Sequence, residues 1–253
     1  MIKNYIKTPD IDIKILSTVD STNDYLKHLA FKGAKDGTIV IANEQTKGKG
    51  SKGRSFISLN GGIYLSVLIR PDFENFDATV ITSLTSVAVS NAIEEVCGKS
   101  IEIKWVNDVL LQNKKVCGIL CESAFSNNNK PEFVVVGIGI NFNKPKEDFP
   151  DEIKDIATYL YIEENEVIKE KLTAKVIDNF FEIYNSLPNK KFLDIYRKRN
   201  CVFNKKINVL KNGLIQNATA LSIDDECRLL VKYDNGIEEL LSSAEISIKL
   251  KEL

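Results

Sequence analysis

One short stretch of the chain concentrates glycines and cations. It runs from Glu44 to Phe56, and no Asp or Glu follows Glu44 until Asp72. Glycine permits backbone angles and close approaches that other residues do not, and the cations can offset negative charge. These residue types predict that the stretch binds an anion. Its glycines and cations are Gly48, Gly50, Gly53, Lys47, Lys49, Lys52 and Arg54.

Three known phosphate loops resemble this stretch. The spacing Gly48-x-Gly50-x-x-Gly53 matches the dinucleotide and protein-kinase loops, and Gly48 to Ser55 misses the Walker A pattern by one Lys-to-Arg change. Rossmann and Walker loops lead from a strand into a helix, but residues 38–43 and 63–69 both read as strands. A kinase requires a His-Arg-Asp loop, and the sole histidine, His28, lies upstream. The context disfavours all three phosphate loops. A solvated surface loop that binds no ligand remains an alternative interpretation.

Composition indicates an ordinary globular chain without an overall cationic field. The 253 residues are 43% hydrophobic and 27% charged, with a net charge of -1. This balance disfavours a nucleic-acid-binding module. With no apolar leader and no long apolar run, we expect a cytoplasmic protein. Five cysteines without a secretory signal predict reduced thiols, and Cys117 and Cys121 lack the further ligands of a metal site.

Several elements must position the glycine stretch. Residues 11–16 predict a first strand, and Ser21 predicts the start of a helix that Gly33 ends, with Asp24 completing a capping box. A second helix is expected over 77–97. Strands are expected over 101–105, 109–111, 116–122 and 133–140, with a turn at 127–131. This order predicts an α+β fold around a mixed or antiparallel sheet flanked by helices.

The chain changes character again after residue 140, and from Asn204 it consists of short strands. A polar connection over 145–156 precedes an amphipathic helix over 166–187 and a basic helical stretch over 190–199. Five short strands then follow turn signals about every ten residues, which is typical of a small barrel. We therefore predict two domains, residues 1–200 and 201–253. The five strands are expected over 207–210, 218–223, 229–233, 238–241 and 246–250.

Four separated segments together resemble the biotin–protein ligases, also called biotin–acetyl-CoA-carboxylase ligases. They are Ser21-Thr22-Asn23, residues 45–54, Lys104 to Asp108 followed by Lys115 to Glu122, and Val136 to Asn141. The resemblance spans nearly the whole chain. It implies a class II synthetase-like catalytic domain followed by an SH3-like domain. It further implies that biotin and ATP, with Mg²⁺, give biotinyl-5′-AMP, and that a lysine of a biotin carboxyl carrier protein then accepts the biotin.

The resemblance also implies roles for individual residues. Lys115 would bridge the biotin carboxylate and the α-phosphate, with Arg54 and Asp108 as further catalytic residues and Asp108 as the Mg²⁺ ligand. ATP would contact Lys49, Arg54, Asn107 and Asn141. Biotin and the adenylate would contact Ser21, Thr22, Asn23, Gln45, Gly48, Lys49, Gly50, Ser51, Lys115, Gly118, Gly137 and Gly139. Without the resemblance, Asn107-Asp108 reads equally well as a tight turn, and Lys115 as an exposed strand-end lysine.

The chain departs from the family pattern mainly in the glycine stretch. Lys49, Ser51 and Lys52 replace arginines, Phe56 replaces a tryptophan, and Val106 replaces a proline. Lysine keeps the charge but loses the bidentate fork, whereas Ser51 loses the charge. We expect slower ordering of this loop or faster release of the adenylate than in an Arg-rich relative.

Two rival functions remain at this point. A lipoate–protein ligase has the same reaction type and a related fold, and a non-catalytic biotin or adenylate sensor would suit the weakened loop. Lys-x-x-Gly-Ile-Leu from Lys115 favours biotin, and an intact Lys115 favours catalysis. Only about twenty residues precede Ser21, so we expect no DNA-binding helix-turn-helix and no repressor activity. No membrane partner is expected, and a free sheet edge would allow a homodimer.

Overall fold

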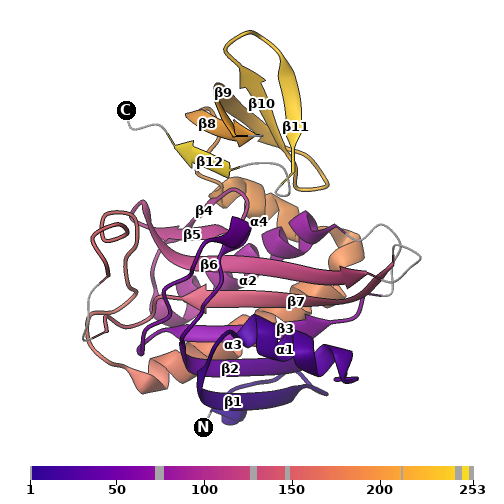
Figure 1. Ribbon diagram of the computed structural model, residues 1–253, viewed down its shortest axis with the longest axis vertical. Helices are drawn as coiled ribbons and strands as arrows, with labels where there is room; N and C mark the ends of the chain where they lie inside the picture. Colours follow the sequence, from indigo (N-terminus) through magenta and orange to yellow (C-terminus); the bar gives the residue numbers. More distant parts are fainter. Residues whose placement is uncertain are drawn as a thin grey trace.

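The fold is taken from a computed structural model that describes residues 2–71, 77–125, 130–145, 149–211 and 213–242, and the backbone of 247–250. A seven-stranded sheet forms the larger part of the molecule (Figure 1). Its strands are β1 (Asp12–Val19), β2 (Thr38–Gln45), β3 (Ile63–Ile69), β4 (Glu102–Lys104), β5 (Asp108–Leu111), β6 (Lys114–Phe125) and β7 (Pro131–Ile140).

The sheet is mixed, with the order β1-β2-β3-β7-β6-β5-β4. The β1–β2 pair is parallel, and the other neighbouring pairs are antiparallel. Every residue of β3 is buried, whereas β1 is largely exposed. A nearly continuous apolar sequence, as in β3, suits a central strand that is covered on both faces. The β1 sequence mixes polar and apolar residues, and β1 lies at the edge of the sheet.

Helices cover the two faces of this sheet unequally. On one face lies α1 (Thr22–Phe31), which contributes Leu26 and Ala30 to a small core with Val40, Leu68 and Phe133. On the other face, the long helix α2 (Ala78–Cys97) packs on the sheet, and α3 (Glu166–Asn185) and α4 (Phe192–Arg199) pack against it. The short α1 leaves part of its face for other groups.

The C-terminal strands form a separate antiparallel sheet in the order β11-β10-β9-β8-β12. It lies beyond α4 and β4, at the end of the molecule opposite β1 (Figure 1). Hydrogen bonds join the C-terminal sheet to the larger part of the molecule. The indole N–H of Trp105 donates to the Cys227 carbonyl at 2.8 Å, and Arg197 Nε donates to the Ile223 carbonyl at 3.0 Å. The strands are β8 (Lys206–Lys211), β9 (Leu214–Ile223), β10 (Leu229–Tyr233), β11 (Glu238–Leu241) and β12 (Ser247–Leu250).

Most of the predicted elements are present, with two corrections. The α3 helix ends at Asn185, and a separate 3-10 turn follows at Leu187–Asn189. The capping box is wrong: Ser21 Oγ does accept from the Asp24 N–H at 3.4 Å, but the Ser21 N–H donates to Asp20 Oδ1 at 2.8 Å. The Asp24 carboxylate instead pairs with the ammonium groups of Lys27 and Lys49. Residues 126–129, 212 and 246, where turns and a strand end were predicted, lie outside the described residues.

All five cysteines are free, as predicted. Burial raises the pKa of the Cys121 thiol to about 12 despite a hydrogen bond with Thr82 that lowers it, so this thiol stays protonated. Among the described residues, no helix combines the length and apolar composition that crossing a membrane requires.

Candidate functional site

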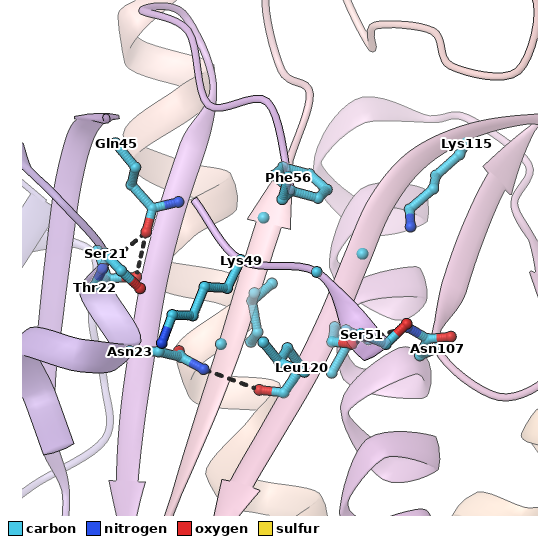
Figure 2. Close-up of a pocket in the computed structure, with 16 residues that line it drawn as sticks. Ser21, Thr22, Asn23, Gln45, Lys49, Ser51, Phe56, Asn107, Lys115 and Leu120 are labelled. Atoms are coloured by element: carbon cyan, nitrogen blue, oxygen red, sulfur yellow. Dashed lines mark hydrogen bonds between the residues drawn. The ribbon is translucent and has the colours of Figure 1, made fainter. Parts of the chain in front are cut away.

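A narrow hollow, with about 40 Å³ of space for water-sized groups and partly open to solvent, lies on the α1 face of the large sheet. The lining comes from the α1 N-terminus, the end of β2, the glycine loop and strands β6 and β7 (Figure 2). The lining residues are Ser21, Thr22, Asn23, Gln45, Lys49, Gly50, Ser51, Phe56, Asn107, Lys115, Gly118, Ile119, Leu120, Gly137, Ile138 and Gly139.

Glycines form the floor where β6 and β7 pair. Gly118 lies opposite Gly139, and Gly137 lies opposite Leu120. A Cβ on Gly137 would lie 2.3 Å from Asn23 Oδ1, and one on Gly139 would lie 2.6 Å from the Phe56 ring. Glycine at both positions therefore allows other groups to lie directly on the sheet backbone. In this structure the ring that does so is that of Phe56.

At one end of the hollow, polar side chains are hydrogen-bonded to one another and to the backbone. Gln45 Oε1 accepts from the Thr22 N–H at 2.8 Å and lies 3.0 Å from Thr22 Oγ1, while Gln45 Nε2 donates to Ser58 Oγ at 2.8 Å. Asn23 Nδ2 donates to Glu122 at 2.8 Å and to the Leu120 carbonyl at 3.3 Å. Ser66 Oγ lies 2.6 Å from Asn23 Oδ1. This end can orient a polar, uncharged ring by hydrogen bonding.

The opposite end carries charge. Lys115 Nζ lies 2.5 Å from Asp108 Oδ1 and 5.8 Å from the centre of the Phe56 ring. The Lys115 backbone is held on both sides, because its N–H donates to the Ile156 carbonyl at 2.8 Å and its carbonyl accepts from Thr158 at 2.9 Å. Part of the predicted polar connection thus runs alongside the start of β6. Figure 2 shows Lys115 and Asn107 across the hollow from Gln45 and Thr22.

The glycine loop covers the hollow as a small hairpin. The Phe56 N–H donates to the Gly48 carbonyl at 2.9 Å, and the Gly50 N–H donates to the Arg54 carbonyl at 2.7 Å. A Cβ on Gly48 would lie 2.3 Å from the Phe56 carbonyl oxygen, so this position requires glycine for the hairpin itself. Lys49 Nζ reaches Asp24 Oδ1 at 2.6 Å.

The structure brings most of the predicted site residues together, and four of them do not line the hollow: Gly48, Arg54, Asp108 and Asn141. The Arg54 guanidinium donates to Ser51, to the hydroxyl at 3.1 Å and to the carbonyl at 3.3 Å. Asn141 is buried, and its Nδ2 donates to the Lys115 carbonyl at 3.4 Å. Asp108 reaches the site through its contact with Lys115.

Sequence reasoning missed Ser66 and Glu122. Ser66 is fully buried inside an aliphatic strand, and a lone hydroxyl in such a run is a signal that could have identified it. Glu122 gave no comparable signal, because its partners Asn23 and Lys27 are about a hundred residues away in the chain.

A magnesium ion would find one carboxylate at this site. The described residues contain no group of three or more His, Cys, Asp or Glu side chains suited to a metal ion. Mg²⁺ is commonly held by one or two carboxylates together with substrate phosphates. Asp108 Oδ1 is buried, with the Lys115 ammonium as its charged partner, so Asp108 suits a site that phosphate oxygens would complete.

Comparison with known proteins gives consistent matches to both sheets. Residues 15–141 match the biotin/lipoate A/B protein ligase family, and residues 202–249 match the biotin protein ligase C-terminal domain. The bifunctional ligase/repressor BirA of Bacillus spizizenii is 36% identical over 233 residues, which cover 89% of this chain and 70% of that protein. The biotin–[acetyl-CoA-carboxylase] ligase of Mycobacterium tuberculosis is 29% identical, over 94% of this chain and 89% of that protein. The Aquifex aeolicus biotin protein ligase in complex with biotin and ATP superimposes with a TM-score of 0.77 at 28% identity, over 95% of this chain and 99% of that one.

Proposed function

The chain belongs to the biotin/lipoate A/B protein ligase family, and from that premise we propose that it is an ATP-dependent biotin–protein ligase. The match of residues 202–249 to a biotin protein ligase domain favours biotin over lipoate as the substrate. The proposed acceptor is a lysine of a biotin carboxyl carrier protein, by analogy with the relatives named biotin–[acetyl-CoA-carboxylase] ligase.

The reaction has two steps. A biotin carboxylate oxygen attacks the α-phosphorus of ATP, and pyrophosphate leaves as biotinyl-5′-AMP forms. The neutral amine of the carrier lysine then attacks the acyl carbon, the bond to the phosphate oxygen breaks, AMP leaves, and the amine loses a proton. The first step brings negative groups together, so it requires positive groups that are already in place.

The observation that carries the proposal is the polarity of the hollow. The end lined by the hydrogen-bonding side chains of Thr22, Asn23 and Gln45 would bind the ureido ring of biotin. The charged end of the hollow, at Lys115, would hold the carboxylate against the α-phosphate, and Asn107 would contact the nucleotide. Asp108 keeps the Lys115 ammonium at this end before substrates arrive. Mg²⁺, held by Asp108 and the phosphates, would supply further positive charge.

Other parts of the proposal concern placement and partners. We assign catalysis to residues 1–200 and the SH3-like domain to residues 201–253. Asn141, which is buried behind the lining, and Arg54, which is exposed on the loop, would act on the nucleotide only if the loop or the connection moves on binding. The cytoplasmic location, a homodimer, and the absence of DNA and membrane partners stay predictions.

Pyrophosphate release with biotin, ATP and Mg²⁺ tests the proposal. Lys115→Ala should lower the rate by about 10²–10³-fold, the usual cost of removing one group that stabilises developing charge. Lys114→Ala is the matched control, because the Lys114 ammonium contacts the Lys154 carbonyl outside the hollow, and it should leave the rate unchanged. Equal rates for Lys115→Ala and the wild type would contradict the mechanism.

Two other measurements test the rival functions. A larger rise in melting temperature with lipoate than with biotin would favour a lipoate–protein ligase. Transfer of labelled biotin to a carrier domain by the wild type would exclude a non-catalytic sensor.

A further inference from the structure

A chain of charged contacts joins the first arm of the glycine hairpin to the floor of the hollow. Lys49 Nζ lies 2.6 Å from Asp24 Oδ1, and Lys27 Nζ lies 2.9 Å from the same oxygen. Lys27 also contacts Glu122 Oε1 at 2.7 Å. The other Glu122 oxygen accepts from Asn23 Nδ2 at 2.8 Å. Loop, helix and strand are thus connected through alternating charges.

The direction of Lys49 matters for its role. Its side chain crosses the hollow toward Asn23, away from Lys115 and Asn107 (Figure 2). Its ammonium is already paired with a carboxylate on the first turn of α1. A cation placed to bind ATP phosphates would instead lie near Lys115, where the α-phosphate is assigned.

The base of the loop and its hairpin are held differently. At the base, backbone hydrogen bonds join Thr46 to Val19 at 2.9 Å and Lys47 to Asp20 at 2.8 Å. In the first arm of the hairpin, the Lys49–Asp24 ion pair connects the loop to α1. Breaking this pair would free the hairpin from α1 while leaving the base in place.

We propose that Asp24 is a positioning residue that holds the glycine loop closed over biotin by pairing with Lys49, and that Lys49 acts on the loop rather than on the ATP phosphates. The inference deepens the proposed function and rests on it for the identity of the ligand. Lys27 and Glu122 extend the same contact to Asn23, so closure of the loop and orientation of the floor amide are connected.

The expected effect is modest. Both side chains are partly exposed, Lys49 by 42% and Asp24 by 36%, and breaking such a pair typically changes an equilibrium by about two- to five-fold. We expect Asp24→Asn to speed amide hydrogen exchange at residues 49–54 of the ligand-free protein by that factor. Biotin dissociation should accelerate similarly, and the KM for ATP should not change.

Three further variants complete the experiment. Lys49→Met should reproduce the effects of Asp24→Asn on the loop without touching α1. The double variant should resemble either single variant in loop exchange, because both substitutions remove the same Lys49–Asp24 contact, whereas the Lys27–Asp24 pair lost in Asp24→Asn does not involve the loop. Glu95→Gln breaks a remote ion pair, with Lys175 at 2.7 Å, and should change none of the three measurements.

The opposite pattern would overturn the inference. A raised KM for ATP in Lys49→Met, with unchanged loop exchange and unchanged biotin dissociation, would make Lys49 a phosphate ligand. Additive effects of the two substitutions on loop exchange would also contradict a shared contact. Loop exchange is measured without any ligand, so it tests the ion pair even if the wild type neither binds biotin nor releases pyrophosphate, an outcome that would reject the proposed function instead.

Discussion

Ser66 places a hydroxyl in the middle of β3, between aliphatic neighbours. The hydroxyl is fully buried, 2.6 Å from Asn23 Oδ1 and 2.8 Å from Thr22 Oγ1. It therefore fixes two of the residues to which biotin binding is assigned. A buried polar group of this kind orients its partners because none of them can turn to water instead.

Ser66→Ala should separate stability from binding. We expect it to lower the free energy of unfolding by about 1–3 kcal/mol, since Asn23 loses a buried partner. Biotin affinity, measured by calorimetry, should fall about ten-fold, which corresponds to roughly 1.4 kcal/mol. Ser90→Ala is the control: Ser90 is equally buried and bonds to the Ser86 carbonyl at 2.7 Å inside α2. It should cost stability and leave biotin affinity unchanged, and an equal loss of affinity in both variants would contradict the assignment.

Ser51 lines the hollow at a position where the resemblance to biotin–protein ligases leads us to expect arginine, and its hydroxyl accepts from Arg54 at 3.1 Å. We expect Ser51→Arg to slow release of biotinyl-5′-AMP by about ten- to a hundred-fold, because a hydrogen bond from a charged group typically contributes about 1.5–3 kcal/mol. Release is measured by trapping free adenylate after a single turnover. Lys52→Arg, which changes a neighbour outside the lining, should have no effect. If Ser51→Arg releases the adenylate at the wild-type rate, the missing charge at position 51 does not weaken adenylate retention.

At the scale of elements, the sequence predicted the helices and strands well, because their apolar periodicity reflects burial on one face or two. The order of the strands could not be read in the same way. The predicted contact of Ser21-Thr22-Asn23 with the later glycines depends on β7 lying between β3 and β6, which the resemblance implied and periodicity did not. The incorrect prediction that Asp24 completes a capping box has a related cause. The capping rule considers only neighbouring residues, whereas the Asp24 carboxylate pairs with Lys49, which comes close only because the glycine loop folds over α1.

The first turn of α1 should be sensitive to acid. Partial burial acts to raise the pKa of Asp24, but hydrogen bonds from Lys49 and Lys27 outweigh it and lower this pKa below the ordinary value of 3.8. A carboxylate with a lowered pKa stabilises the fold above its unfolded pKa and loses that contribution as the pH falls through the folded value. We therefore expect the free energy of unfolding of the wild type, relative to Asp24→Asn, to be constant above about pH 5 and to decline below pH 3.8.

Chemical denaturation at several pH values measures this difference, and an NMR titration gives the pKa of Asp24 directly. The Asp24→Asn protein retains its other carboxylates, so its own acid sensitivity serves as the baseline. Parallel curves for the two proteins across the whole range would mean that the Asp24 ion pairs contribute nothing to folding.

At the scale of the whole molecule, the C-terminal sheet supports the charged end of the site. Trp105 donates to the carbonyl of Cys227 in the turn between β9 and β10, and Asn107 and Asp108 follow Trp105 by two and three residues. The buried Tyr196 hydroxyl donates to the Val106 carbonyl at 3.2 Å. The turn that carries Asp108 is therefore held from the side of α4 and the C-terminal sheet. These contacts connect the second sheet to the turn that carries Asp108, to which the first step of the reaction is assigned.

Arg197→Met should weaken this support without entering the site. Arg197 joins α4 to the C-terminal sheet through the Ile223 carbonyl at 3.0 Å and the Asp225 carboxylate at 2.7 Å. Losing a partly buried charged donor should cost about 1–3 kcal/mol and separate the unfolding of the two sheets, which calorimetry would record as a broader or divided transition. Hydrogen exchange at residues 105–108 should accelerate, and pyrophosphate release should slow because Asp108 no longer holds Lys115 as firmly. Lys232→Met, whose contact with Glu238 at 3.7 Å joins β10 to β11 within the C-terminal sheet, should leave exchange at 105–108 unchanged, and equal acceleration in both variants would show that the support does not pass through α4.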